Sequence, residues 1–262
     1  MKRMKVLSVM LALLTMGFVA CQKEDMNEPG PAFMGVKMVA LNTSYSLPVE
    51  KSSTKSAVAS PGIAWDEVRM VVSEVELEAE LKSLLTHEDS IEIEYKWKGP
   101  QVVNLLDSTQ TFGNFILQPG FYDEIELKVG GEREDARPEP VFYMSGNYTN
   151  AAAGETIPVV VEVYSDLEFK TEKESVEVTE DNLDITSTIQ LYLDELMAGI
   201  SPEQLDNAAL SEGVIVISED SNSQLFQSVL GKLAEERDCR YWHKNKYDDD
   251  DDDYYDDDDD DD

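Results

Sequence analysis

The strongest constraint on the fold lies between Trp65 and Leu81, where apolar and glutamate residues alternate strictly from Glu74 to Leu81. A period of two places successive side chains on opposite faces of a strand, so this pattern predicts a half-buried antiparallel strand. Its two faces are Val75, Leu77, Ala79 and Leu81 on one side and Glu74, Glu76, Glu78 and Glu80 on the other. Upstream, Val68, Met70 and Val72 have the opposite parity. We therefore expect a bulge or bend near residues 71–73.

Similar short patterns recur along the chain, separated by turn residues. Residues 91–98 alternate in the same way and end at Gly99-Pro100. The remaining expected strands are 35–46, before a loop at 47–62, and then 101–106, 122–129, 141–144, 156–164, 168–171, 175–179 and 186–193. Regularly spaced short strands without long helices between them indicate an antiparallel β-sandwich, here over 35–195.

After residue 193 the periodicity becomes helical. Ser201-Pro202-Glu203-Gln204 has the residues of a capping box with proline at the first helical position. A buried strand is expected at 213–218, and a second helix from about Asn222 with an apolar stripe of core character. These elements, 196–237, are interpreted as a closure packed on the sandwich.

The N-terminus has the organisation of a secretory signal. Three basic residues precede an apolar run, Val6 to Ala20, that is too short to span a membrane. The sequence Phe18-Val19-Ala20-Cys21 resembles the lipobox of bacterial lipoproteins. This resemblance implies that residues 1–20 are removed, that Cys21 is lipidated, and that 21–34 form a tether from the outer membrane.

Lys23, Glu24 and Asp25 resemble an export signal of surface-exposed lipoproteins of some gram-negative bacteria. Surface display is therefore expected, with retention on the periplasmic leaflet as the alternative. If Cys21 carries lipid, the second cysteine, Cys239, is left without an internal disulfide partner.

The charge balance excludes one class of partner. There are 55 acidic and 21 basic residues, for a net charge of −34. Such a chain repels the phosphates of nucleic acids and attracts cations, so no nucleic-acid binding is expected.

One region resembles a known family. Two segments, 102–107 (VVNLLD) and 116–127 (ILQPGFYDEIEL), are similar to the signature of bacterial surface and periplasmic domains of unknown function, which are commonly lipoproteins. The resemblance covers roughly 35–195 and implies a transthyretin-like or immunoglobulin-like β-sandwich, with no catalytic residues to transfer.

The same motif can be interpreted physically. Pro119 and Gly120 suit the central positions of a type II turn. Tyr122 occupies the place where Greek-key sandwiches have a tyrosine whose hydroxyl binds upstream backbone.

Residues for catalysis or cofactor binding are not evident in the sequence. There is no G-x-S-x-G elbow, H-E-x-x-H or paired C-x-x-C motif, and we expect neither enzymatic activity, a bound cofactor nor a specific metal site. Tyr95 and Trp97 share a strand face and offer a possible glycan platform, although the alternation favours a position facing the core. The four glutamates at 74–80 are interpreted as a solvated outer face.

The C-terminal segment 238–262 contains a run of aspartates broken by two tyrosines. Such a segment is predicted to be disordered and to attract divalent cations diffusely, at residues such as Asp248, Asp253, Asp256 and Asp262. A basic protein partner is the alternative. The sequence as a whole predicts a non-catalytic, lipid-anchored cell-envelope module for binding or assembly. The alternatives are a pilus- or fimbria-associated subunit and a glycan-binding surface lipoprotein.

Overall fold

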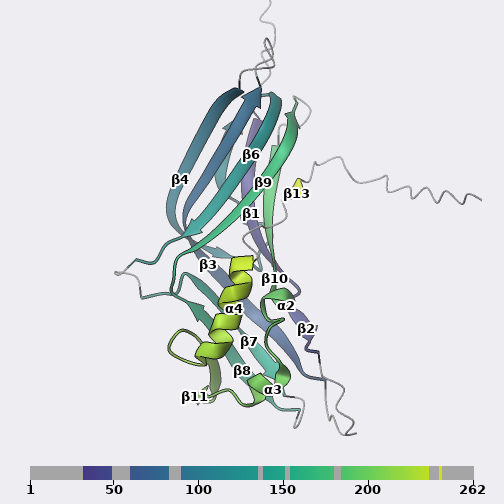
Figure 1. The fold of residues 1–262 in the computed structure, drawn as a ribbon, viewed down its shortest axis with the longest axis vertical. Helices are drawn as coiled ribbons and strands as arrows, with labels where there is room; N and C mark the ends of the chain where they lie inside the picture. The colour runs from purple at the N-terminus through teal and green to yellow at the C-terminus, as the bar shows by residue number, and fades with distance from the viewer. Residues whose placement is uncertain are drawn as a thin grey trace, which may run out of the picture. The chain divides into compact units, whose positions relative to one another are not determined.

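The fold is mainly β, as the alternation predicts (Figure 1). The computed structural model describes residues 32–48, 60–82, 90–134, 138–150, 154–179, 184–235 and 242–243. Several predictions fall outside these residues: the signal peptide, Cys21, Lys23, Glu24, Asp25 and the aspartates from 248 onward. No helix in the described part of the chain is both long and apolar enough to cross a membrane.

The described strands form two sheets. The smaller sheet has the order β13-β10-β1-β5, formed by Trp242–His243, Asp184–Tyr192, Ala32–Leu41 and Phe112–Leu117. The larger has the order β11-β12-β8-β7-β3-β6-β9, formed by Leu210–Ser211, Val214–Ile217, Thr156–Val163, Phe142–Thr149, Gly62–Lys82, Gly120–Gly131 and Leu167–Val178. Two further strands, β2 (Ser44–Ser46) and β4 (Ser90–Asn104), pair with β3.

Strand β3 organises the larger sheet because it changes neighbours along its length. Its first part pairs with β7 over Gly62–Met70, and its second part pairs with β6 over Glu74–Leu81. Strand β4 follows the opposite edge, and its register shifts between Val72 and Glu74. This irregularity confirms the predicted bend. It also turns the buried side of β3 from one parity to the other, with Val72 and Val75 both fully buried.

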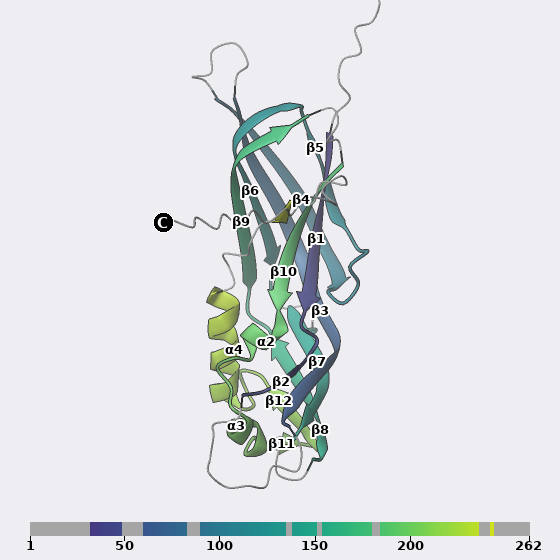
Figure 2. The ribbon, with the colours of Figure 1, turned by 90° about the vertical axis from the view of Figure 1, so that its right-hand side faces the viewer.

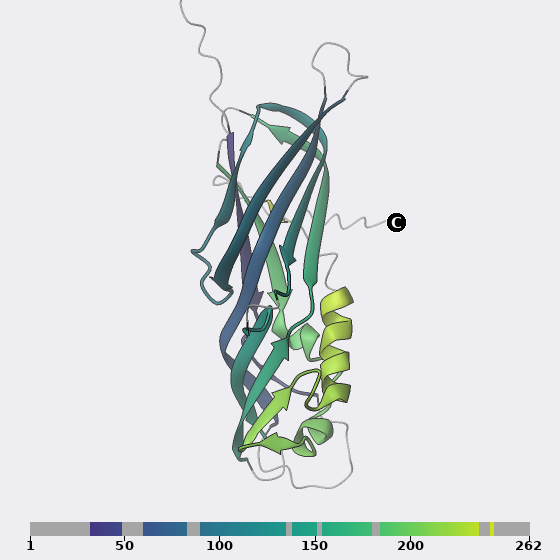
Figure 3. The same ribbon diagram turned by 90° about the vertical axis from the view of Figure 1, so that its left-hand side faces the viewer.

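One apolar core joins the two sheets. Figure 2 shows β1 and β10 on one side of the described sandwich, and Figure 3 shows β4, β3, β6 and β9 on the other. Side chains from both layers belong to a single buried cluster, including Met34 and Met38 of β1, Leu191 of β10 and Leu77 of β3. The sandwich prediction is therefore confirmed.

Three helices are described, one more than predicted. Helix α3 (Pro202–Asp206) begins with the expected capping box, in which the Ser201 hydroxyl accepts from the Gln204 backbone and the Gln204 side chain accepts from the Ser201 backbone. Helix α4 (Ser223–Glu235) buries its apolar stripe against the core. The additional helix is the single turn α2 (Leu193–Leu196), which directly continues β10.

Some predicted boundaries were wrong. The strands expected at 91–98 and 101–106 form one strand, β4, which continues through Gly99-Pro100. Proline lacks a backbone donor, but β4 pairs only with β3 among the described strands, and an edge strand tolerates this loss. The strands expected at 168–171 and 175–179 are likewise joined in β9, where Ser175 has a φ of 58°. Strand β5 was not predicted.

The turn before β6 also differs from the prediction. Gly120 has a φ of 159° and already belongs to β6, so Pro119 and Gly120 do not form a type II turn. The predicted tyrosine corner is present. The Tyr122 hydroxyl donates to the Gln118 carbonyl oxygen at 2.8 Å and accepts from the Gln118 backbone N–H at 3.1 Å.

Two strand pairs of this largely antiparallel sandwich are parallel. Strand β1 pairs with β10, and β12 pairs with β8. The two members of each pair are far apart in sequence, so no tight turn forces them to be antiparallel. Trp242 and His243, within the segment expected to be disordered, form β13.

Candidate functional site

The outer face of β4, β3, β6 and β9 carries two consecutive cross-strand rows of glutamate. The cross-strand register places one glutamate from each strand in each row. The first row is Glu94, Glu78, Glu126 and Glu172, and the second is Glu92, Glu80, Glu124 and Glu174. We call these eight residues the glutamate rows. Like charges directly opposite one another in a sheet are destabilising, so this arrangement requires compensation.

Lys96, Lys128 and Lys170 lie with Glu76 in the next cross-strand row, which we call the lysine row, and they supply part of that compensation. Lys96 Nζ lies 2.6 Å from Glu74 Oε1 and 3.1 Å from Glu76 Oε1. Lys128 and Lys170 both contact Glu126, at 2.8 Å and 2.6 Å. The first glutamate row therefore borders a row of ammonium groups, whereas the second lies one step further away.

This difference shifts the pKa values of two carboxyl groups in opposite directions. Burial by itself would raise the pKa of Glu126, but the ammonium groups of Lys128 and Lys170 hold it below its ordinary value. The pKa of Glu124 is raised by desolvation and by the negative charges of Glu172, Glu126 and Glu80. Neighbouring residues of β6 on one face thus have opposite electrostatic environments.

Glu124, Glu126 and Glu172 bring carboxylate oxygens within 4.8 Å of one another. The sequence alone did not predict this grouping, because alternate glutamates along one strand lie about 7 Å apart, too far for chelation. The E-x-E pattern in several strands was the available signal, but only the register between strands brings the carboxylates together. Because two lysines already neutralise Glu126, the cluster offers charge attraction rather than a preorganised metal site.

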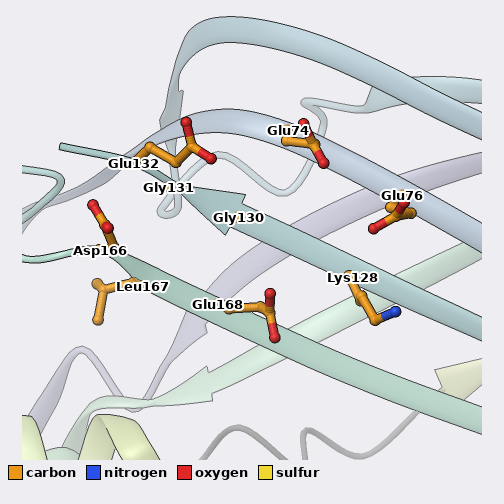
Figure 4. Close-up of a pocket in the computed structure, with 9 residues that line it drawn as sticks. All are labelled: Glu74, Glu76, Lys128, Gly130, Gly131, Glu132, Asp166, Leu167 and Glu168. Atoms are coloured by element: carbon orange, nitrogen blue, oxygen red, sulfur yellow. The ribbon is translucent and has the colours of Figure 1, made fainter. Parts of the chain in front are cut away.

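A hollow of about 380 Å³ lies next to the lysine row (Figure 4). Gly130, in the lining, has no side chain to fill this space. Figure 4 shows the carboxylates of Glu74, Glu132 and Glu168 around the hollow. Asp166, also in the lining, accepts from the Arg133 backbone N–H at 2.6 Å. The lining is predominantly acidic, so the hollow attracts cations and repels anions.

The proposed glycan platform faces the core. Tyr95 and Trp97 lie opposite the buried Leu77 and Val75 on the inward side of β4. Both are half-buried against the core, and the Tyr95 ring centroid is 6.0 Å from that of Phe115 on β5. Sugar stacking requires an exposed ring face, which this position disfavours.

The free edge of β4 is the second unusual surface. This strand of 15 residues pairs only with β3 among the described strands, and it lies at the margin of the sheet in Figure 1. Its register with β3 is regular from Ser90 to Lys98, without a bulge. Its inward positions over this stretch are all apolar, and Ile91 is 57% exposed.

The other long edge, β9, has features that protect against strand addition. Lys173 occupies an inward position in line with the buried Leu167 and Phe169. Ser175, with its positive φ, interrupts the extended backbone. Inward-pointing charges and local irregularities are the devices by which natural edge strands avoid pairing with other chains. Strand β4 lacks both between Ser90 and Lys98.

Comparisons with family models, curated proteins and solved structures found no match for this chain.

Proposed function

We propose that this protein is a non-catalytic, lipid-anchored module of the bacterial cell envelope that assembles with a protein partner through the edge of β4. The observation that carries the assembly role is the long, regular and unprotected β4 edge. The pilus-associated alternative shares this mode of assembly, because a subunit of that kind also has an edge strand completed by a neighbour.

Strand addition suits this edge for two physical reasons. An edge strand presents a row of backbone N–H and C=O groups that a second strand satisfies, and main-chain hydrogen bonds supply the affinity. A partner strand would also cover the inward apolar row, including the exposed Ile91. Burying such side chains contributes about 25 cal/mol per Å² of apolar surface removed from water.

The location rests on the sequence alone. The basic and apolar N-terminus and the lipobox-like residues before Cys21 support anchoring in the outer membrane, and Lys23, Glu24 and Asp25 support surface display. Replacing Cys21 by serine is expected to abolish labelling by radioactive palmitate and to move the protein from the membrane fraction to the soluble fraction. Equal labelling of the native and Cys21→Ser chains would overturn the anchor.

The assembly role is tested by photo-crosslinking in cells. A benzoylphenylalanine placed at Glu94 lies on the outward side of the β4 edge strand, and the matched control at Glu174 lies on the outward side of β9. Both positions are exposed glutamates. We expect a discrete adduct from position 94 and none from position 174. No adduct at 94, or equal adducts at both positions, would contradict assembly through β4.

A further inference from the structure

We propose that the strand added to β4 is β4 of a second copy of the chain, antiparallel and centred on Tyr95. This inference rests on the proposed assembly role of the β4 edge and identifies its occupant. The resulting dimer would have two-fold symmetry, with the same edge used by both copies. The two larger sheets would then form one continuous sheet.

The evidence is a self-complementary charge pattern on the outer side of the edge. Glu92 and Glu94 precede Tyr95, and Lys96 and Lys98 follow it at the same spacings. An antiparallel pair centred on Tyr95 places Glu94 opposite Lys96 of the second copy. It also places Glu92 opposite Lys98 of the second copy, and the symmetry repeats both contacts. Opposite charges directly across a strand pair stabilise it, and here every charged pair between Glu92 and Lys98 is complementary.

Other registers lack this property. Centring the pair on Glu94 brings two copies of Glu94 together, and centring it on Lys96 brings two copies of Lys96 together. A shift by one residue sets outward side chains opposite inward ones. In-register parallel pairing places each glutamate against glutamate and each lysine against lysine. The charge pattern therefore selects one orientation and one register.

The inward row is also compatible with this pairing. Ile93 would lie opposite Trp97 of the second copy, and Tyr95 would meet its own symmetry mate. All of these positions are apolar or aromatic and half-buried. Cross-strand pairs of aromatic and β-branched side chains are favourable. The regular stretch ends at Gly99-Pro100, where the register with β3 shifts.

The charges are available for intermolecular contacts. Glu92 and Glu94 have no ion-pair partner within the described part of the chain. The Lys98 side chain is 71% exposed, and its contact with Glu74 is long, at 3.9 Å. Lys96 already contacts Glu74 and Glu76, so we expect the Glu92–Lys98 contacts to contribute more specificity than the Glu94–Lys96 contacts.

The net charge of −34 opposes the approach of two copies. At about 0.15 M salt the screening length is about 8 Å, which suppresses long-range repulsion more than contacts between adjacent side chains. We therefore expect dimerisation to be stronger at this ionic strength than at about 0.01 M, where the screening length is about 30 Å.

A charge exchange tests the proposal on the full-length protein in non-ionic detergent with reductant, by sedimentation velocity. The acidic-edge variant carries Lys96→Glu and Lys98→Glu, and the basic-edge variant carries Glu92→Lys and Glu94→Lys. We expect each variant alone to dimerise at least about tenfold more weakly than the native chain, because the four pairs become repulsive. Mixing the two is expected to restore a dimer.

The variant with all four substitutions is the decisive control. It restores every opposite-charge pair in the antiparallel register and none in the parallel one, so we expect it to dimerise like the native chain. Circular dichroism verifies that each variant is folded. A native chain that stays monomeric, single-edge variants that dimerise like the native chain, or a fourfold variant that stays monomeric would each overturn the proposal.

The register has its own test. In a Cys239→Ser background, chains with Glu94→Cys are mixed with chains carrying Lys96→Cys. Directly opposite residues have Cα atoms about 4.5 to 5.5 Å apart, within the range of a disulfide. We expect an oxidised heterodimer to form faster than either homodimer, and preferential homodimers would overturn the register. If the native chain is monomeric but position 94 crosslinks to another protein in cells, the proposed function stands and this inference fails.

Discussion

Glu78 of β3 lies directly opposite Glu126 of β6, and the ammonium group of Lys128 contacts both carboxylates, at 3.1 Å and 2.8 Å. Two carboxylates directly opposite one another across a sheet repel, so Lys128 turns an unfavourable cross-strand pair into a bridged one. The outer face of the sheet therefore depends on a small number of lysines placed beside many glutamates. This dependence is measurable.

Replacing Lys128 by glutamine should lower the free energy of unfolding by about 1 to 2 kcal/mol, because two ion pairs are lost and the opposing carboxylates are left unbridged. The matched control is Lys98→Gln. Its single contact is 3.9 Å long and its side chain is 71% exposed, so a change within about 0.5 kcal/mol is expected. Urea unfolding at pH 7 measures both, and equal effects would contradict the bridging role.

Glu124→Gln and Glu126→Gln should have opposite effects on stability at pH 7. Folding raises the pKa of Glu124 above its ordinary value of 4.5. Protonated Glu124 therefore contributes to the free energy of unfolding below pH 4.5, and this contribution is lost as the pH rises through the folded-state pKa. At pH 7 its charge is unfavourable, and Glu124→Gln should stabilise by about 0.5 kcal/mol.

The folded-state pKa of Glu126 is lowered, so its contribution is present above 4.5 and is lost as the pH falls through the folded value. Glu126→Gln should therefore destabilise by about 1 kcal/mol at pH 7, and less as the pH falls below 4. Thermal unfolding between pH 3 and pH 7 measures both variants. If both substitutions changed the free energy of unfolding in the same direction at pH 7, the lysine row would not distinguish the two carboxylates.

Tyr122→Phe should lower the free energy of unfolding by about 1 to 2 kcal/mol. The substitution removes both hydrogen bonds between the hydroxyl and the Gln118 backbone while retaining the ring. Tyr143→Phe is the control, because the packing of Tyr143 with Arg69 involves the ring rather than the hydroxyl. Guanidinium unfolding compares the two variants. If Tyr122→Phe leaves the free energy of unfolding unchanged, the hydrogen bonds of the Tyr122 hydroxyl do not stabilise the fold.

Two glycine substitutions should change stability in opposite directions. A Cβ at Gly146 would lie 2.8 Å from the Trp65 Cα and closer still to the Ala64 carbonyl oxygen, so Gly146→Ala should destabilise by about 2 kcal/mol or more. A Cβ at Gly231, inside α4, has no other heavy atom within 4 Å. Gly231→Ala should stabilise by about 0.5 to 1 kcal/mol, because alanine favours the helix. Differential scanning calorimetry measures both changes.

Local patterns determined much of the secondary structure. The alternation at 74–81 predicted a half-buried strand, and the change of parity after Val72 predicted its bend, because side-chain direction in a strand depends only on residue order. The capping box at Ser201 and the corner at Tyr122 were also predictable, since each involves residues within four positions of one another.

Only the tertiary structure decided which strands become neighbours. The parallel pairing of β1 with β10 joins segments about 150 residues apart, and no local pattern specifies that contact. The glutamate rows and their lysines have the same origin, because a row exists only when four strands share a register. The sequence by itself determined which residues of each strand face the core. The packing of the sheets decided which strand was left at the edge, because an edge is defined by the absence of a neighbour among the described strands rather than by any residue of its own.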